Sequence, residues 1–231
     1  MVRVPRGSYS DYVRPLELDA AGIMVPHIMS AKDARNVVNM TRFHPIGRRA
    51  VDGGNADGAY CKVGLTDYIK QANAQRFVVV QIEDPEPMEE LEEIAALPGI
   101  DMLFFGPADY SHGIGAPAEW NNPKIAEAFE RIAEVCKRHN KIAGTVVGPY
   151  SVSQLLDWGY RFINVGVDIF GIDQYFKNLL SDFRVCVNAE ASPLTRATQS
   201  VQDLPSQDSN GNIAYGRAAT PELVLEGVSK H

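Results

Sequence analysis

Short runs of apolar residues alternate with segments in which apolar residues recur every three or four positions, from Gly22 to about Val187. Runs that are apolar along their whole length are typical of parallel strands buried by helices on both faces. The runs predict strands at 1–5, 22–26, 77–83, 101–105, 141–147 and 161–167. The helical patterns predict helices at 11–20, 31–40, 85–96, 123–139, 152–158 and 169–186. Pro15 argues against the first of these helices, because proline cannot donate a backbone hydrogen bond inside it.

This alternation of strands and helices predicts an α/β fold, either an open doubly wound sheet or a closed barrel. Six strand–helix units are present, whereas a closed barrel has eight. The Gly- and Asp-rich stretch at 50–59 is predicted to be a loop. We expect a barrel domain at 1–188 and a polar, disordered tail at 189–231, with a short terminal helix at 221–228.

Composition excludes several classes of partner. The net charge of −7 and the lack of a basic run argue against binding to nucleic acid. No apolar stretch is long enough to span a bilayer, and the first residues do not form a signal peptide. Three widely spaced cysteines indicate reduced thiols. We therefore expect a cytoplasmic protein that acts on small molecules, with no nucleic-acid or membrane partner.

The candidate functional residues follow two of the predicted strands. Glu83 follows the strand at 77–83, and Asp109 follows Gly106 and Pro107 after the strand at 101–105. Active sites of α/β barrels are assembled at this rim, and paired carboxylates suit Mg²⁺ or Mn²⁺. The alternative is that both residues only cap the helices that follow. Position alone leaves these two interpretations open.

Five motifs carry a more specific signal. They are Val2-Arg3 followed by Val25-Pro26, Pro45-Ile46-Gly47-Arg48-Arg49, Gln81-Ile82-Glu83, Gly106-Pro107-Ala108-Asp109 and Val165-Gly166-Val167-Asp168. In this combination the chain resembles the metal-dependent class II pyruvate aldolases of the HpcH/HpaI aldolase/citrate lyase family. The resemblance covers residues 1–187 and implies a TIM (β/α)8 barrel of the phosphoenolpyruvate/pyruvate type.

The resemblance also implies roles for individual residues. Glu83 and Asp109 would bind a divalent metal ion (Mg²⁺, Mn²⁺ or Co²⁺), and Arg3 would be the catalytic group that holds the oxo group of pyruvate and its enolate. Gln81 would orient the substrate carbonyl. The backbone N–H groups of Ala108 and Asp109 would bind the substrate carboxylate.

The implied function is a carbon–carbon lyase that cleaves or forms 4-hydroxy-2-oxo acids through a pyruvate enolate, in a homo-oligomer of three or six chains. One alternative is an oxaloacetate-decarboxylating enzyme that forms the same enolate, like macrophomate synthase. Another is a truncated, non-catalytic paralogue that binds metal and keto acid.

One family signature is missing. The Asp-x-Glu-His segment on the second family strand, whose histidine takes part in proton transfer, does not occur in this sequence. Arg3 corresponds to the end of the third family strand, so we expect the chain to lack the first strands of the barrel. His27 is interpreted mainly as a loop histidine and Arg49 as a surface residue. Trp120 and Tyr110 are expected to pack in the core, and Asp168 to cap the last helix.

Overall fold

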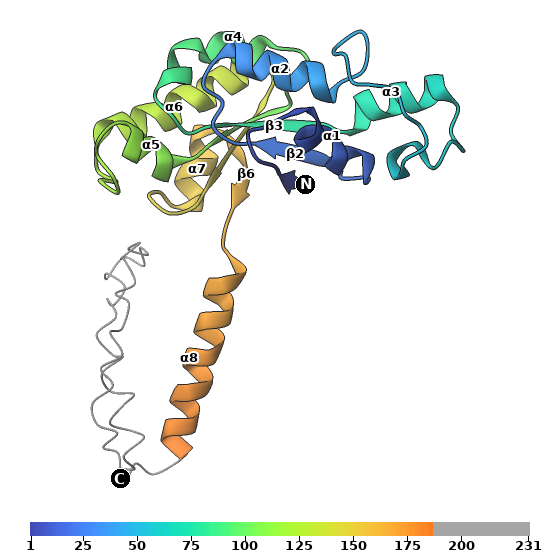
Figure 1. The fold of residues 1–231 in the computed structure, drawn as a ribbon. Helices are drawn as coiled ribbons and strands as arrows, with labels where there is room; N and C mark the ends of the chain where they lie inside the picture. Colours follow the sequence, from blue (N-terminus) through green and yellow to red (C-terminus); the bar gives the residue numbers. More distant parts are fainter. Residues whose placement is uncertain (187–231) are drawn as a thin grey trace, which may run out of the picture. The chain divides into compact units, whose positions relative to one another are not determined.

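A computed structural model describes the backbone of residues 1–186 and side chains through residue 181. Six parallel strands pair in chain order and form a curled half-barrel (Figure 1). The strands are β1 (Val2–Arg3), β2 (Gly22–Val25), β3 (Phe77–Ile82), β4 (Met102–Phe105), β5 (Ile142–Val146) and β6 (Tyr160–Asn164). They belong to a compact unit of residues Met1–Gly171, and the described residues from Ile172 onward belong to a separate unit. All six predicted strands are confirmed, as is the barrel-type α/β fold.

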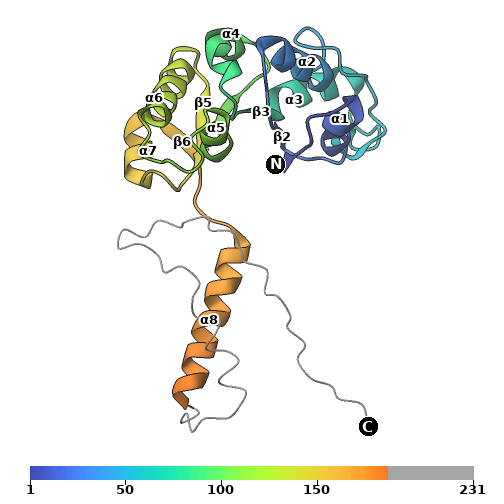
Figure 2. The ribbon, with the colours of Figure 1, turned by 60° about the vertical axis from the view of Figure 1, so that its left-hand side comes forward.

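Helices follow every strand. They are α1 (Tyr9–Glu17), α2 (Ala31–Thr41), α3 (Leu65–Gln75), α4 (Leu91–Ala96), α5 (Pro107–Gly113), α6 (Pro123–Arg138), α7 (Val152–Trp158) and α8 (Asp168–Cys186). Two 3-10 helices are η1 (Ala56–Gly58) and η2 (Glu86–Glu90). Helices α2, α4 and α6 lie along the outer face of the sheet (Figure 2). No helix in the described part of the chain is long and apolar enough to cross a membrane.

The two faces of the sheet bury different side chains. On the outer face, Val78, Val80 and Ile82 join the large core that packs against the helices. On the inner face, Met24, Val79, Met102 and Phe104 form a second cluster. Successive strand residues point to opposite faces, so Gln81 lies on the same inner face as Val79, above it along β3. Along the strands, the side chains of the inner face therefore change from apolar residues to polar residues at the carboxyl ends.

Three local predictions need correction. The predicted helix at 85–96 is instead η2 followed by α4, and the two are separated at Glu90, whose φ of −108° and ψ of 14° are not α-helical. Helix α1 does form and contains Pro15, since burial of Tyr12, Val13 and Leu16 outweighs the lost bond. Helix α3 was not predicted, although Tyr68 and Ala72 follow helical spacing and are buried. The expected tail at 189–231 and helix at 221–228 lie outside the described residues.

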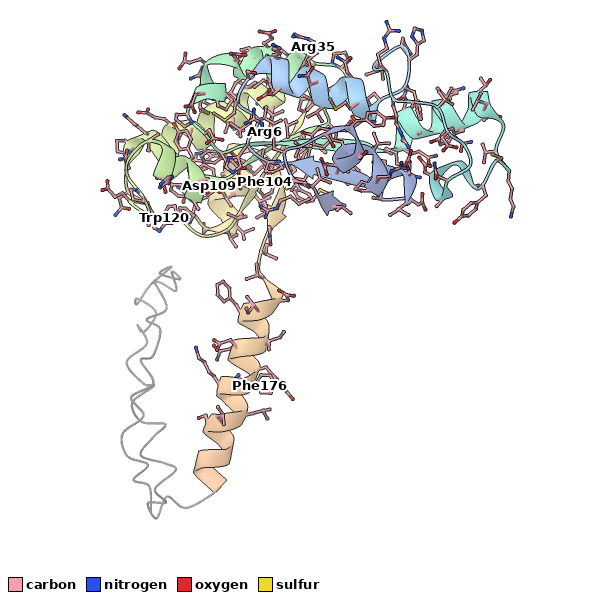
Figure 3. All side chains as sticks on the ribbon, in the orientation of Figure 1. Arg6, Arg35, Phe104, Asp109, Trp120 and Phe176 are labelled. Carbon is pink, nitrogen blue, oxygen red and sulfur yellow. The ribbon has the colours of Figure 1, made fainter. Side chains whose placement is uncertain are left out.

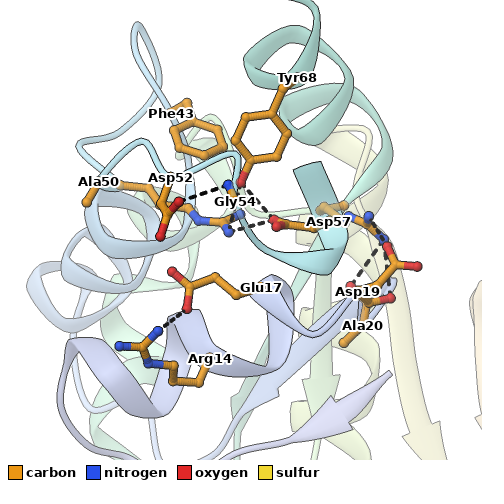
Figure 4. Close-up of polar contacts among 12 residues, drawn as sticks. Arg14, Glu17, Asp19, Ala20, Phe43, Ala50, Asp52, Gly54, Asp57 and Tyr68 are labelled. Atoms are coloured by element: carbon orange, nitrogen blue, oxygen red, sulfur yellow. Dashed lines mark hydrogen bonds and ion pairs between the residues drawn. The ribbon is translucent and has the colours of Figure 1, made fainter. Parts of the chain in front are cut away.

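The prediction that Arg49 is a surface residue is wrong. The Arg49 and Asp57 side chains are fully buried and form a 2.7 Å ion pair, and Asp57 lies beside Tyr68 (Figure 4). The Tyr68 hydroxyl donates a 2.9 Å hydrogen bond to Asp57, and burial raises the pKa of Tyr68. The Arg49 guanidinium also lies 4.7 Å from the centre of the Phe43 ring. This cluster anchors the loop, which is why an arginine there is buried. Tyr110 and Trp120 do pack against the core, as predicted.

Candidate functional site

Glu83 is the central side chain of the site. It follows β3, and its side chain is almost completely buried. One carboxylate oxygen accepts a 2.8 Å hydrogen bond from the backbone N–H of His27, and the other accepts one of 2.8 Å from Gln81. Burial is the main cause of a raised pKa of Glu83, and the charges of Asp109 and Asp84 raise it further. The fold thus buries a carboxylate with hydrogen bonds but little compensating positive charge.

Gly106 makes room for this carboxylate. A Cβ atom added at Gly106 would lie 2.6 Å from Oε2 of Glu83 and 2.8 Å from its Cβ. Any side chain at position 106 would therefore displace the carboxylate from its place. The need for glycine at the start of the Gly106-Pro107-Ala108-Asp109 motif comes from this close approach to Glu83.

Asp109 reaches the same region from the neighbouring strand. It lies in the first turn of α5, which begins directly after β4, and its side chain is exposed (Figure 3). Pro107 occupies the first helical position, where a missing N–H costs nothing. Asp109 is close enough for its charge to raise the pKa of both Glu83 and His27. The Gly106-Pro107-Ala108-Asp109 motif is therefore the start of a short helix that places Asp109 beside Glu83.

Gln81 positions the Glu83 carboxylate, and one of its own polar atoms has no hydrogen-bond partner among the described residues. Its amide nitrogen donates to Glu83, while its amide oxygen is buried without a partner among the described residues. A buried hydrogen-bond acceptor without a donor destabilises the folded state by about 1–3 kcal/mol. The Gln81 amide oxygen therefore points to a donor or cation that the protein chain itself does not supply.

Arg3 ends β1 and is exposed. It pairs in register with Met24, which pairs with Val79, so its side chain belongs to the inner face of the sheet. Arg3 forms no ion pair within the described residues. The structure thus places the Arg3 side chain on the inner face of the sheet, where its charge has no ion-pair partner among the described residues.

His27 also lies at this rim, directly after β2. Its Nδ1 is 2.9 Å from a carboxylate oxygen of Asp84 and 3.6 Å from one of Glu83. The hydrogen bond to Asp84 is the main cause of a raised pKa of His27. Asp84 was not among the predicted site residues, because a second carboxylate directly after Glu83 reads as part of an acidic helix start. Ala108 and Asp109 are exposed at the start of α5, which leaves their backbone accessible.

These residues fit a divalent cation. Carboxylate oxygens are the donors that Mg²⁺ and Mn²⁺ prefer, and such ions keep several water ligands. Within residues 1–181 no group of three or more histidine, cysteine, aspartate or glutamate side chains is arranged to hold a metal ion. A site here would therefore use the two carboxylates and leave the remaining ligand positions to water or substrate. Together the fold and the site define a class: a β/α barrel protein with two neighbouring carboxylates, Glu83 and Asp109, at its rim.

The chain belongs to the HpcH/HpaI aldolase/citrate lyase family, whose family model matches residues 1–172. It is 32% identical over 186 residues to 2-keto-3-deoxy-L-rhamnonate aldolase of Klebsiella pneumoniae subsp. pneumoniae, covering 80% of this chain and 69% of that protein. It is 32% identical over 199 residues to hydroxypyruvate/pyruvate aldolase of Delftia acidovorans, covering 85% and 73%. These relatives are aldolases, so the family relationship supports a lyase.

Similarity to a solved structure agrees with this assignment. A crystal structure of an HpcH/HpaI aldolase/citrate lyase family protein from Burkholderia cenocepacia J2315 superimposes with a TM-score of 0.71 at 32% sequence identity. The alignment covers 79% of this chain and 73% of that protein. The resemblance inferred from five short motifs is thereby confirmed at the level of family and fold.

Proposed function

We propose that the protein is a metal-dependent aldolase that cleaves or forms 4-hydroxy-2-oxo acids through a pyruvate enolate. The observation that carries this proposal is the buried Glu83 carboxylate beside Asp109, at the rim of a β/α barrel. The relatives that act on keto acids support the substrate class. A divalent ion bound there would polarise the carbonyl of a 2-oxo acid and make the adjacent C–H bond acidic.

The residues of the chain supply the rest of the chemistry. Gln81 fixes the orientation of Glu83 through its amide N–H. The backbone N–H groups of Ala108 and Asp109, at the exposed start of α5, are donors for the substrate carboxylate. Arg3 brings an uncommitted guanidinium to the face on which negative charge develops during C–C cleavage, where fixed positive charge stabilises the transition state.

The test is to measure pyruvate release, coupled to lactate dehydrogenase, with a panel of 4-hydroxy-2-oxo acids and with oxaloacetate. We expect metal-dependent cleavage of at least one hydroxy-oxo acid. Release from oxaloacetate alone would identify a decarboxylating enzyme instead. Binding of Mn²⁺ and pyruvate without any turnover would identify a non-catalytic binding protein. Absence of both metal binding and turnover would contradict the proposal.

We also propose that the protein forms a homo-oligomer of three or six chains. Along α8, Ile172, Tyr175, Phe176 and Leu179 recur at helical spacing and are exposed. An apolar stripe of this kind is typical of a helix that packs against a partner. Light scattering should give the mass of a trimer or hexamer for the wild type and a smaller mass for Phe176→Ser. A monomeric wild type would contradict this proposal.

A further inference from the structure

His27 combines features that a simple loop histidine does not require. It adopts a left-handed backbone conformation, with a φ of 50°. This conformation is unfavourable for most residues, by about 1 kcal/mol or more, and persists where the surroundings impose it. Here it directs the His27 N–H to Glu83, while the imidazole Nδ1 lies 2.9 Å from Asp84. The backbone and the side chain of one residue therefore join Glu83 and Asp84.

The contact with Asp84 defines the chemistry of the imidazole. Because a carboxylate oxygen accepts hydrogen bonds, this contact favours the tautomer in which Nδ1 carries the proton. The second ring nitrogen, Nε2, makes no hydrogen bond among the described residues. About half of the His27 side chain is exposed, compared with about a fifth of that of Asp84. Asp84 thus fixes the ring and leaves one polar nitrogen available at the rim of the site.

We propose that His27 is a specificity-determining residue that binds a hydroxyl group on the substrate chain beyond C3. This inference rests on the proposed function, because it assigns part of the same site. A hydroxyl group both donates and accepts, so it can pair with Nε2 whether or not that nitrogen carries a proton. A second substrate carboxylate would be repelled by Glu83, Asp84 and Asp109, which all lie near the imidazole. An unsubstituted alkyl chain would gain no hydrogen bond.

The test compares two acids that differ by one oxygen atom, 4-hydroxy-2-oxopentanoate and 2-oxopentanoate. Their affinities for the Mn²⁺-loaded protein are measured by titration at low temperature, with pyruvate determined at the end so that only uncleaved acid is counted. We expect the hydroxylated acid to bind about 10-fold more tightly, which corresponds to about 1.4 kcal/mol. In His27→Asn this preference, taken as the ratio of the two affinities measured on the same variant, should fall to less than 2-fold.

Asparagine suits this substitution because it tolerates positive φ, so the backbone N–H bond to Glu83 should survive. Asp84→Asn provides a second variant, in which the ring is less firmly held and the preference should fall only in part. The matched control is His44→Ala, an exposed histidine outside the site, which should keep the full preference. An undiminished preference in His27→Asn would overturn the inference and leave the proposed function intact. If neither acid binds the Mn²⁺-loaded wild type, the proposed function fails and the inference fails with it.

Discussion

Buried charged side chains have different surroundings at the two ends of the sheet. At the end where the strands begin, the buried Arg42 side chain forms an ion pair with Asp101 and donates to the carbonyl oxygens of Gly99, Asn73 and Arg76. At the end where the strands finish, Glu83 is equally buried, but its one cationic neighbour among the described residues is the half-exposed His27 imidazole at 3.6 Å, and other carboxylates lie close to it. Arg42 therefore has a full ion pair within the chain, whereas Glu83 has no arginine or lysine partner among the described residues.

This difference separates a structural charge from a functional one. A buried charge is very unfavourable unless it is paired, so a fold that leaves one underpaired indicates a missing partner. Arg42 ties the ends of α2 and α3 to the start of β4, and its partners are all part of the chain. Glu83 has no arginine or lysine partner among the described residues, and the amide oxygen of Gln81 beside it has no hydrogen-bond partner there. The following predictions test this contrast, beginning with the largest expected effect.

Replacing Arg42 should have the largest effect on stability. In Arg42→Met the three carbonyl groups lose their donor and Asp101 loses its ion pair, so we expect a loss of about 3–5 kcal/mol in the free energy of unfolding. Urea denaturation measures this. Arg35→Met is the matched control, since Arg35 forms an exposed ion pair with Glu93 that should contribute less than about 1 kcal/mol. Similar losses in the two variants would contradict the structural role of Arg42.

Replacing Arg3 should affect chemistry rather than stability. Arg3→Lys keeps the charge but loses the planar set of donors, so we expect turnover to fall by about 10²-fold, as when one oxyanion donor is removed. The free energy of unfolding should change by less than about 0.5 kcal/mol, because Arg3 is an exposed residue of an edge strand. Exchange of the C3 protons of pyruvate, followed by NMR, is a direct measurement. Near-normal exchange would show that Arg3 is only a strand residue.

Removing a carboxylate charge should have opposite effects on stability at the two ends of the sheet. The folded chain raises the pKa of Glu83, so it holds that proton more tightly than the unfolded chain. The stability contributed by Glu83 is therefore present below its ordinary pKa and is lost as pH rises through the folded pKa. In metal-free protein at pH 7, Glu83→Gln should stabilise by about 1 kcal/mol. The gain should disappear near pH 4.

Asp101→Asn is the matched variant at the other end. Asp101 has an arginine partner and accepts a 2.7 Å hydrogen bond from the backbone N–H of Val78. Its replacement should destabilise the metal-free protein at pH 7, by about 1–3 kcal/mol. Urea denaturation of both variants in the presence of a chelator measures whether each substitution raises or lowers the free energy of unfolding. A loss of stability in Glu83→Gln at pH 7 would remove the distinction between the ends.

The sequence was sufficient to predict the strands and the positions of Glu83 and Asp109 at their ends. Buried parallel strands, and the residues that follow them, are recognised from a local pattern of apolar residues. It was insufficient for Arg49, whose burial depends on Asp57 and Tyr68 being brought together by the fold. It also missed Asp84, because the importance of that residue comes from His27, which is 57 positions away along the chain. Gly106 was predicted only as part of a motif, and its close approach to Glu83 becomes apparent in the three-dimensional structure.

We propose that Glu83 and Asp109 together bind a divalent ion. Calorimetric titration with Mn²⁺ of the wild type, Glu83→Ala and Asp109→Ala tests it most directly, with Arg3→Lys as the control that keeps both carboxylates. Two protein ligands leave no redundancy. The wild type and Arg3→Lys should bind one Mn²⁺ ion, and both alanine variants should show no binding. Unchanged Mn²⁺ affinity in either alanine variant would contradict the account.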